Sequence, residues 1–126
     1  MKRLTLGLGL LALVAITAAC SPTAGAPASA GPVDPNAPVV IAQNNAFSPA
    51  ALTVKADKAF GLTLDNKDGV PHNLAIYRDS SAAEKVSIGE IVTSASATQQ
   101  VPALAKGQHF FRCDVHHEMT GTIVAE

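Results

Sequence analysis

Cysteine and methionine are scarce in this chain, with two of each among 126 residues, and beyond the first twenty residues only Cys113 and Met119 remain. A disulfide within that later part is therefore excluded, and Cys20 is the sole intramolecular partner that Cys113 could have. An unpaired thiol exposed outside the cytoplasm is prone to oxidation and to intermolecular pairing. If the protein is exported, we expect Cys113 to be buried or bound to a metal.

Basic patches and long hydrophobic runs are also lacking. Residues 39–126 carry seven lysine and arginine residues against nine aspartate and glutamate residues, with no cluster of positive charge interleaved with aromatics. Nucleic acid is therefore not an expected partner. The apolar run Leu4–Ala19 has 16 residues, which is short for a transmembrane helix of about 20 residues.

That apolar run has the layout of a secretory signal peptide, because Lys2 and Arg3 precede it and small residues follow. The next residue, Cys20, resembles the lipobox cysteine of bacterial lipoproteins, which becomes the lipid-bearing N-terminus. We therefore predict a signal peptide over residues 1–19, lipidation of Cys20, and export to a membrane-anchored position facing the periplasm or the cell exterior. An ordinary signal peptide or an uncleaved anchor are the alternatives.

A linker is predicted to follow over residues 20–38. Ser21–Pro38 contains five prolines and five alanines, so it has too little apolar surface to fold on its own. Proline-rich linkers are extended by about 3.1 Å per residue, which gives this one a reach of roughly 55 Å. We interpret it as a stalk that holds residues 39–126 away from the membrane.

Residues 39–126 show the period-two alternation of β-strands bounded by turn residues. Their 88 residues suit one domain with a single core. Short strands at this spacing predict an all-β sandwich or barrel. In the weakly patterned segment 80–97, we expect a helical turn over 82–85 and a strand over 90–93. The clearest strand patterns lie at 39–41, 52–55, 60–65, 72–77, 109–113 and 120–124.

Cys113, His116 and Met119 are spaced by three residues, between the last two predicted strands. A strand would direct the first two to opposite faces, and a helix would not bring all three to one point. A turn between two strands can do so. His72 lies far away in the sequence, so only tertiary structure could bring its imidazole to the same point.

Thiolate, imidazole and thioether donors together favour copper, and two histidines with a cysteine and a weak axial methionine are typical of blue-copper electron-transfer sites. A structural zinc site would have no use for Met119. Two alternatives stay open on the residues alone: His117 could replace His116 as a ligand, and Met119 could be a core residue.

The segment Asn66–Val124 resembles the cupredoxins, a family of small blue copper proteins. The resemblance rests on Gly69-Val70-Pro71-His72-Asn73 and on the Cys113-x2-His116-x2-Met119 spacing. It implies an antiparallel Greek-key β-sandwich of seven to eight strands that binds one type 1 copper ion. It also implies His72, Cys113 and His116 as equatorial ligands, Met119 as axial ligand, and Asn73 as a hydrogen-bonding support of the ligand loop.

The resemblance further implies one-electron transfer to a redox partner protein through His116. We therefore expect a monomeric electron carrier outside the cytoplasm, not an enzyme. Copper storage, delivery or sensing is the alternative, although such sites use repeated methionines and histidines. A self-contained copper enzyme would need a second site, for which only His109 and His117 remain.

Overall fold

The computed structural model describes residues 36–126, and the predicted signal peptide, Cys20 and most of the linker lie outside the described residues. The described residues form nine strands. They are β1 (Val39–Gln43), β2 (Ala46–Ser48), β3 (Ala51–Val54), β4 (Phe60–Asn66), β5 (Ala75–Tyr77), β6 (Lys85–Ile88), β7 (Ser96–Val101), β8 (Gly107–Arg112) and β9 (Thr120–Ala125).

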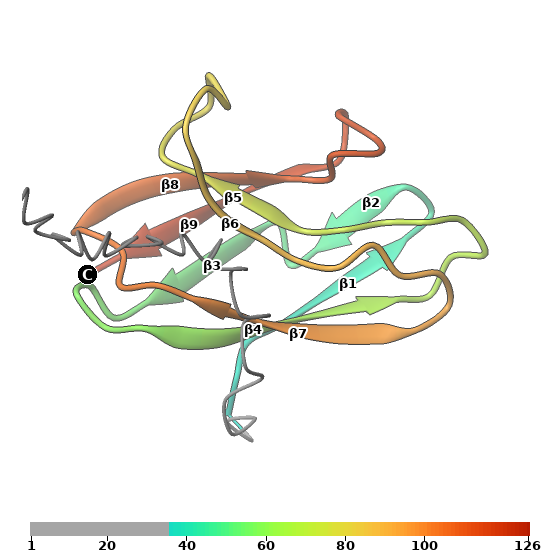
Figure 1. The fold of residues 1–126 in the computed structure, drawn as a ribbon, viewed down its shortest axis with the longest axis horizontal. Helices are drawn as coiled ribbons and strands as arrows, with labels where there is room; N and C mark the ends of the chain where they lie inside the picture. Colours follow the sequence, from blue (N-terminus) through green and yellow to red (C-terminus); the bar gives the residue numbers. More distant parts are fainter. Residues whose placement is uncertain (1–35) are drawn as a thin grey trace, which may run out of the picture.

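The strands make a sandwich of two sheets (Figure 1). One sheet has the order β2-β1-β4-β7, and the other has the order β3-β9-β8-β5-β6. The predicted all-β sandwich is thus confirmed. The sheets are mixed, because β1 pairs with β4 and β3 pairs with β9 in parallel. The described residues form one strand more than the upper end of the seven to eight that the resemblance implied.

The core lies between the sheets and follows from the alternation of the sequence. In β1, Val40 and Ala42 are buried while their neighbours are exposed, and Leu62 and Leu64 of β4 are buried beside them. Phe111 of the opposite sheet is fully buried and packs its ring against Phe47, with ring centroids 5.5 Å apart. One apolar cluster therefore joins both sheets.

The weakly patterned segment 80–97 differs from its prediction. It contains no helical turn over 82–85, because Ala82 has a left-handed φ of 52°, which a right-handed helix does not tolerate. Strand β6 instead covers Lys85–Ile88. The strand expected over 90–93 is reduced to an isolated bridge between Val92 and His72. Strand β7 was not predicted.

The described part of the chain contains no helix with the length and hydrophobicity needed to cross a lipid bilayer.

Two connections lie at the same end of the sandwich, on the right in Figure 1. One joins β4 to β5 and contains His72, and the other joins β8 to β9 and contains Cys113, His116 and Met119. The topology thus brings the predicted ligand segments, which are far apart in the sequence, to one end of the molecule.

Candidate metal centre

The β8–β9 loop is short and held by its own backbone. Ladder pairing ends where Arg112 lies opposite Thr120. Beyond that pair, the Cys113 N–H donates to the carbonyl of Met119 at 3.0 Å, and the Met119 N–H donates to the carbonyl of His116 at 3.0 Å. Residues 113–119 therefore form a closed turn, as the spacing of its donor residues predicted.

The sulfur of Cys113 lies inside this turn. Cys113 is fully buried and has no disulfide with any residue from 36 to 126. The His116 N–H points at its Sγ atom at 3.4 Å.

The second segment is held by main-chain bonds on both sides of His72. Its N–H donates to the carbonyl of Val92 at 3.0 Å, and the Val92 N–H donates back to the His72 carbonyl at 2.9 Å. The His72 side chain is fully buried. Its Nε2 atom lies 3.0 Å from Oδ2 of Asp68, so its Nδ1 atom is the one that faces the β8–β9 loop.

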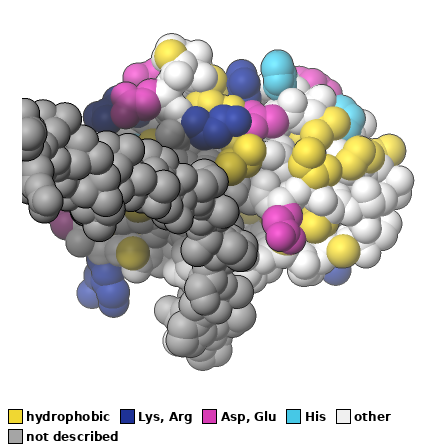
Figure 2. All heavy atoms as spheres, in the orientation of Figure 1, with side chains coloured by type: hydrophobic (Ala, Val, Ile, Leu, Met, Phe, Trp, Pro, Cys, Tyr) yellow, Lys and Arg dark blue, Asp and Glu magenta, His cyan; other side chains and the backbone are white. Residues whose placement is uncertain are grey.

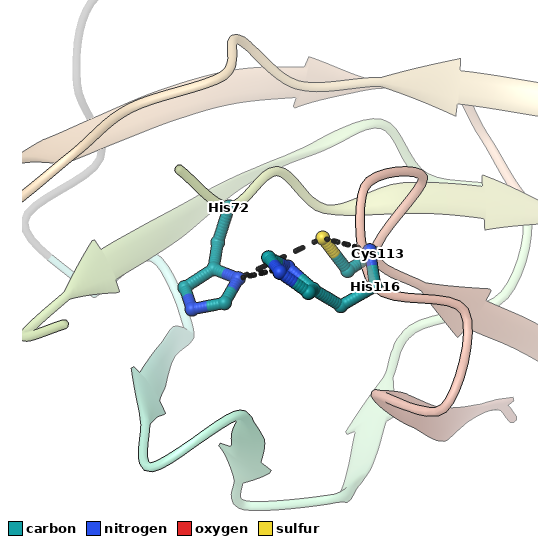
Figure 3. Close-up of side chains that lie close together, drawn as sticks. All are labelled: His72, Cys113 and His116. Carbon is teal, nitrogen blue, oxygen red and sulfur yellow. Dashed lines mark hydrogen bonds between the residues drawn. The ribbon is translucent and has the colours of Figure 1, made fainter. Parts of the chain in front are cut away.

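The three predicted equatorial donors converge (Figure 3). The Nδ1 atom of His72 lies 3.9 Å from the Sγ of Cys113 and 3.1 Å from the Nδ1 of His116. No two of the donor atoms are more than 4.8 Å apart. His72 and Cys113 are separated by 41 residues in the sequence.

This arrangement fits a single metal ion. Bonds of about 2.0 Å to nitrogen and about 2.3 Å to sulfur would span a separation of up to roughly 4.3 Å between two donors. Both separations from His72 are shorter than that, at 3.9 and 3.1 Å. The longest separation, at most 4.8 Å, needs an inward shift of only a few tenths of an ångström. The donors are therefore nearly placed for binding.

The remaining predicted residues lie as follows. Met119 is 1% exposed and belongs to the apolar core cluster, with its backbone bonded to both Cys113 and His116. His117 is exposed, whereas His116 is half-buried. The Nε2 of His109 lies 2.8 Å from the carbonyl of Ala105, outside the donor cluster.

Asn73 joins the two donor segments. Its Oδ1 atom accepts a hydrogen bond from the backbone N–H of Asp114 at 2.8 Å, and its side chain is buried. Because Asn73 follows His72 and Asp114 follows Cys113, this bond fixes the two donor residues relative to each other.

Asp114 takes part in a polar cluster that the sequence did not indicate. Its carboxylate accepts hydrogen bonds from the hydroxyl of Tyr77 and from Nζ of Lys85, the latter at 2.8 Å. Burial opposes ionisation of this carboxyl, but the bonds from Lys85 and Tyr77 outweigh it and hold the pKa of Asp114 below its usual value. The anion therefore anchors the start of the loop to β5 and β6.

Asp68, whose carboxylate contacts His72, was also missed by the sequence analysis. The backbone N–H groups of Asn45 and Asn44 donate to its carboxylate and hold the pKa of Asp68 below its usual value. A carboxylate four residues before a donor histidine is the signal that could have revealed it.

Comparison with known proteins agrees with this geometry. The profile of the cupredoxin-like domain matches residues 9–125, which is most of the chain. The chain belongs to the cupredoxin family. Type 1 copper is the cofactor of this family, and two imidazoles, a thiol and a thioether are the donors that such an ion takes.

Individual cupredoxins support the assignment. Plastocyanin A/B of Petroselinum crispum is 35% identical over 74 residues, covering 56% of this chain and 74% of the relative. Auracyanin A of Chloroflexus aurantiacus, a "blue" copper protein, superposes with a TM-score of 0.64 at 16% identity, over 70% of this chain and 96% of its own. Amicyanin of Paracoccus versutus superposes with a TM-score of 0.57 at 24% identity, over 75% of this chain and 86% of its own. The two structures share the fold.

Proposed function

We propose that this cupredoxin is a one-electron carrier, not an enzyme, that binds one type 1 copper ion through His72, Cys113 and His116, with Met119 as the axial donor. One observation carries the proposal: a buried thiol and two imidazole nitrogens from distant segments lie within 4.8 Å of one another. When bound, copper supplies the couple between its two oxidation states, and the thiolate and thioether select it over harder metals.

The protein's own part is to hold the donors still and to keep water out. His72 and Cys113 have no solvent exposure, and the bonds from Val92 and Asn73 fix their segments. Donors that keep their places in both oxidation states make electron transfer less costly in reorganisation. His116 is only half-buried, so the electron passes to and from the partner protein through the exposed edge of its ring.

The surface at this end suits a redox partner protein. Val70, Ile91 and Val115 are exposed, and each is adjacent in sequence to a residue of the donor segments or of the bridge that holds them. Figure 2 shows hydrophobic side chains over the right-hand part of the molecule, with histidine side chains along the upper edge. An apolar rim of this kind supports transient docking near His116.

The proposed location is outside the cytoplasm, with residues 1–19 as a signal peptide, Cys20 lipidated at a membrane, and residues 20–38 as the stalk of a monomeric domain. It is supported by the charge, hydropathy and cysteine pattern of this segment. Intact mass of the protein from membranes tests it: a diacylglyceryl-modified Cys20 at the N-terminus is expected, and a mature N-terminus beyond Cys20 contradicts it.

The function is tested by adding Cu(II) to the purified full chain. We expect an intense blue thiolate-to-copper absorption band that bleaches on reduction and returns on oxidation, and no band in the Cys113→Ala variant. A complex that forms only with Cu(I) and cannot be reoxidised would contradict electron carriage and favour copper storage or delivery.

A further inference from the structure

The carboxylate of Asp68 accepts hydrogen bonds from three donors, one of which is a proposed metal ligand. Its Oδ1 accepts from the backbone N–H of Asn44 at 2.8 Å. Its Oδ2 accepts from the backbone N–H of Asn45 at 3.1 Å and lies 3.0 Å from Nε2 of His72. The carboxylate therefore bridges the β1–β2 turn and the imidazole.

Asp68 is itself held from both sides, so its carboxylate has a defined position. Its backbone N–H donates to Oδ1 of Asn66 at 2.8 Å. Its carbonyl accepts from the backbone N–H of Ser94 at 3.1 Å and from the hydroxyl of Ser94 at 3.0 Å. Asn44 and Asn45 both have left-handed φ angles, 54° and 55°, which turn their N–H groups toward the carboxylate.

The contact with Asp68 decides which nitrogen of His72 carries the proton. An ionised carboxylate can only accept a hydrogen bond, so this contact selects the tautomer that carries its N–H on Nε2. The lone pair is then on Nδ1, which is the atom that faces Cys113 and His116. The opposite tautomer would place a proton where a metal ion must bind.

We infer that Asp68 is a positioning residue of the copper centre: it fixes Nδ1 of His72 as the metal donor and strengthens its donation toward Cu(II). The inference rests on the proposed function, because it concerns the same site. A carboxylate that accepts the second N–H of a metal-bound imidazole fixes the ring and raises its basicity. A more basic imidazole stabilises the more highly charged cupric ion more than the cuprous ion.

Asparagine cannot replace this carboxylate, although it has nearly the same shape. An amide offers one oxygen and one NH₂ group. If its oxygen faced Asn45 and His72, its NH₂ group would meet the N–H of Asn44, and the reverse orientation would leave His72 without an acceptor. Asp68→Asn is thus a nearly isosteric test of the charge and of the acceptor pattern.

The matched control is Asp65→Asn. Asp65 lies in β4 of the same region, and its carboxylate contacts Ser96 at 2.9 Å and Lys67 at 2.8 Å but no proposed ligand. Affinities for Cu(II) and Cu(I) are measured on the full-length wild type and both variants, together with the reduction potential and the urea midpoint of the metal-free proteins.

For Asp68→Asn we expect a loss of about tenfold or more in Cu(II) affinity and a smaller loss in Cu(I) affinity. For each factor of ten by which the Cu(II) affinity falls more than the Cu(I) affinity, the one-electron reduction potential rises by about 59 mV. Asp65→Asn should change neither affinity more than about twofold, since its carboxylate lies outside the site. An Asp68→Asn protein whose two affinities fall equally, or not at all, overturns the inference, because a merely structural role does not alter their ratio.

A measurement on the metal-free wild type keeps the inference testable if the variant fails to fold. The ¹⁵N resonances of His72 should show a protonated Nε2 and an unprotonated Nδ1, with slow exchange of the Nε2 proton. A neutral ring that carries its only proton on Nδ1 overturns the inference. This result does not depend on copper, so a wild type that binds no copper refutes the proposed function while the tautomer still decides the role of Asp68.

Discussion

At the scale of single residues, the adjacent histidines of the β8–β9 loop lie in different environments. His116 is half-buried and points its Nδ1 atom at His72, whereas His117 is exposed. The sequence left both open as ligands, because each is a histidine near Cys113. The turn closes through the His116 carbonyl and the Met119 N–H, and it places the ring of His116, not that of His117, beside His72.

This difference predicts opposite outcomes for two alanine variants. His116→Ala should lose the blue band with Cu(II), because it removes one of the converging nitrogen donors. His117→Ala should keep both the band and its wavelength, since its ring is in solvent. Absorption spectroscopy of the copper-loaded variants checks this. Loss of the band in His117→Ala alone would reverse the ligand assignment.

At the scale of secondary structure, the patterned strands were predictable and the others were not. Strands β4, β8 and β9 contain large apolar residues, which made them recognisable as strands. In β7 the partly buried positions are Ala97 and Gln99, which give no hydrophobic contrast. Gln99 belongs there because it bonds Ser87 and the carbonyl of Leu74, which hydropathy does not reveal.

The β8–β9 hairpin also depends on a close contact between Phe111 and Gly121, which lie opposite each other. A Cβ atom on Gly121 would lie 2.1 Å from the Phe111 ring and 2.6 Å from the carbonyl of Ala50. Neither the fully buried ring nor the backbone can move away at low cost. The absence of a side chain at residue 121 therefore allows the aromatic ring to pack over the hairpin.

We predict that Gly121→Ala lowers the free energy of unfolding by about 3 kcal/mol, because it overpacks the core. Gly69→Ala is the control: a Cβ atom there meets nothing within 4 Å, so its effect should stay within about 0.5 kcal/mol. Urea unfolding of the metal-free proteins measures both. Equal stability of the two variants would show that the hairpin absorbs the added methyl group.

At the scale of the whole molecule, the metal centre exists only when both sheets are assembled. His72 lies in the connection from β4 to β5, which joins the two sheets, and Cys113 follows β8. An unfolded chain would leave these donors 41 residues apart. Metal binding and folding should therefore be thermodynamically linked.

We expect Cu(I), added without oxygen, to stabilise the folded chain by about 4 kcal/mol when its free concentration is a thousand times the dissociation constant. Urea midpoints with and without the metal measure this. Cys113→Ala removes the thiolate, so its midpoint should barely move on metal addition. A wild-type midpoint that is also unchanged would mean that the folded state does not create the site.

The sequence by itself determined the donor chemistry and the loop, because the spacing of Cys113, His116 and Met119 between two patterned strands is local information. It also determined the all-β class through alternation. Tertiary structure alone decided which nitrogen of His72 faces the site and made Asp68 its partner. Those properties depend on hydrogen bonds between the β4–β5 connection, the β1–β2 turn and residue 94, and such bonds form only once the segments have packed.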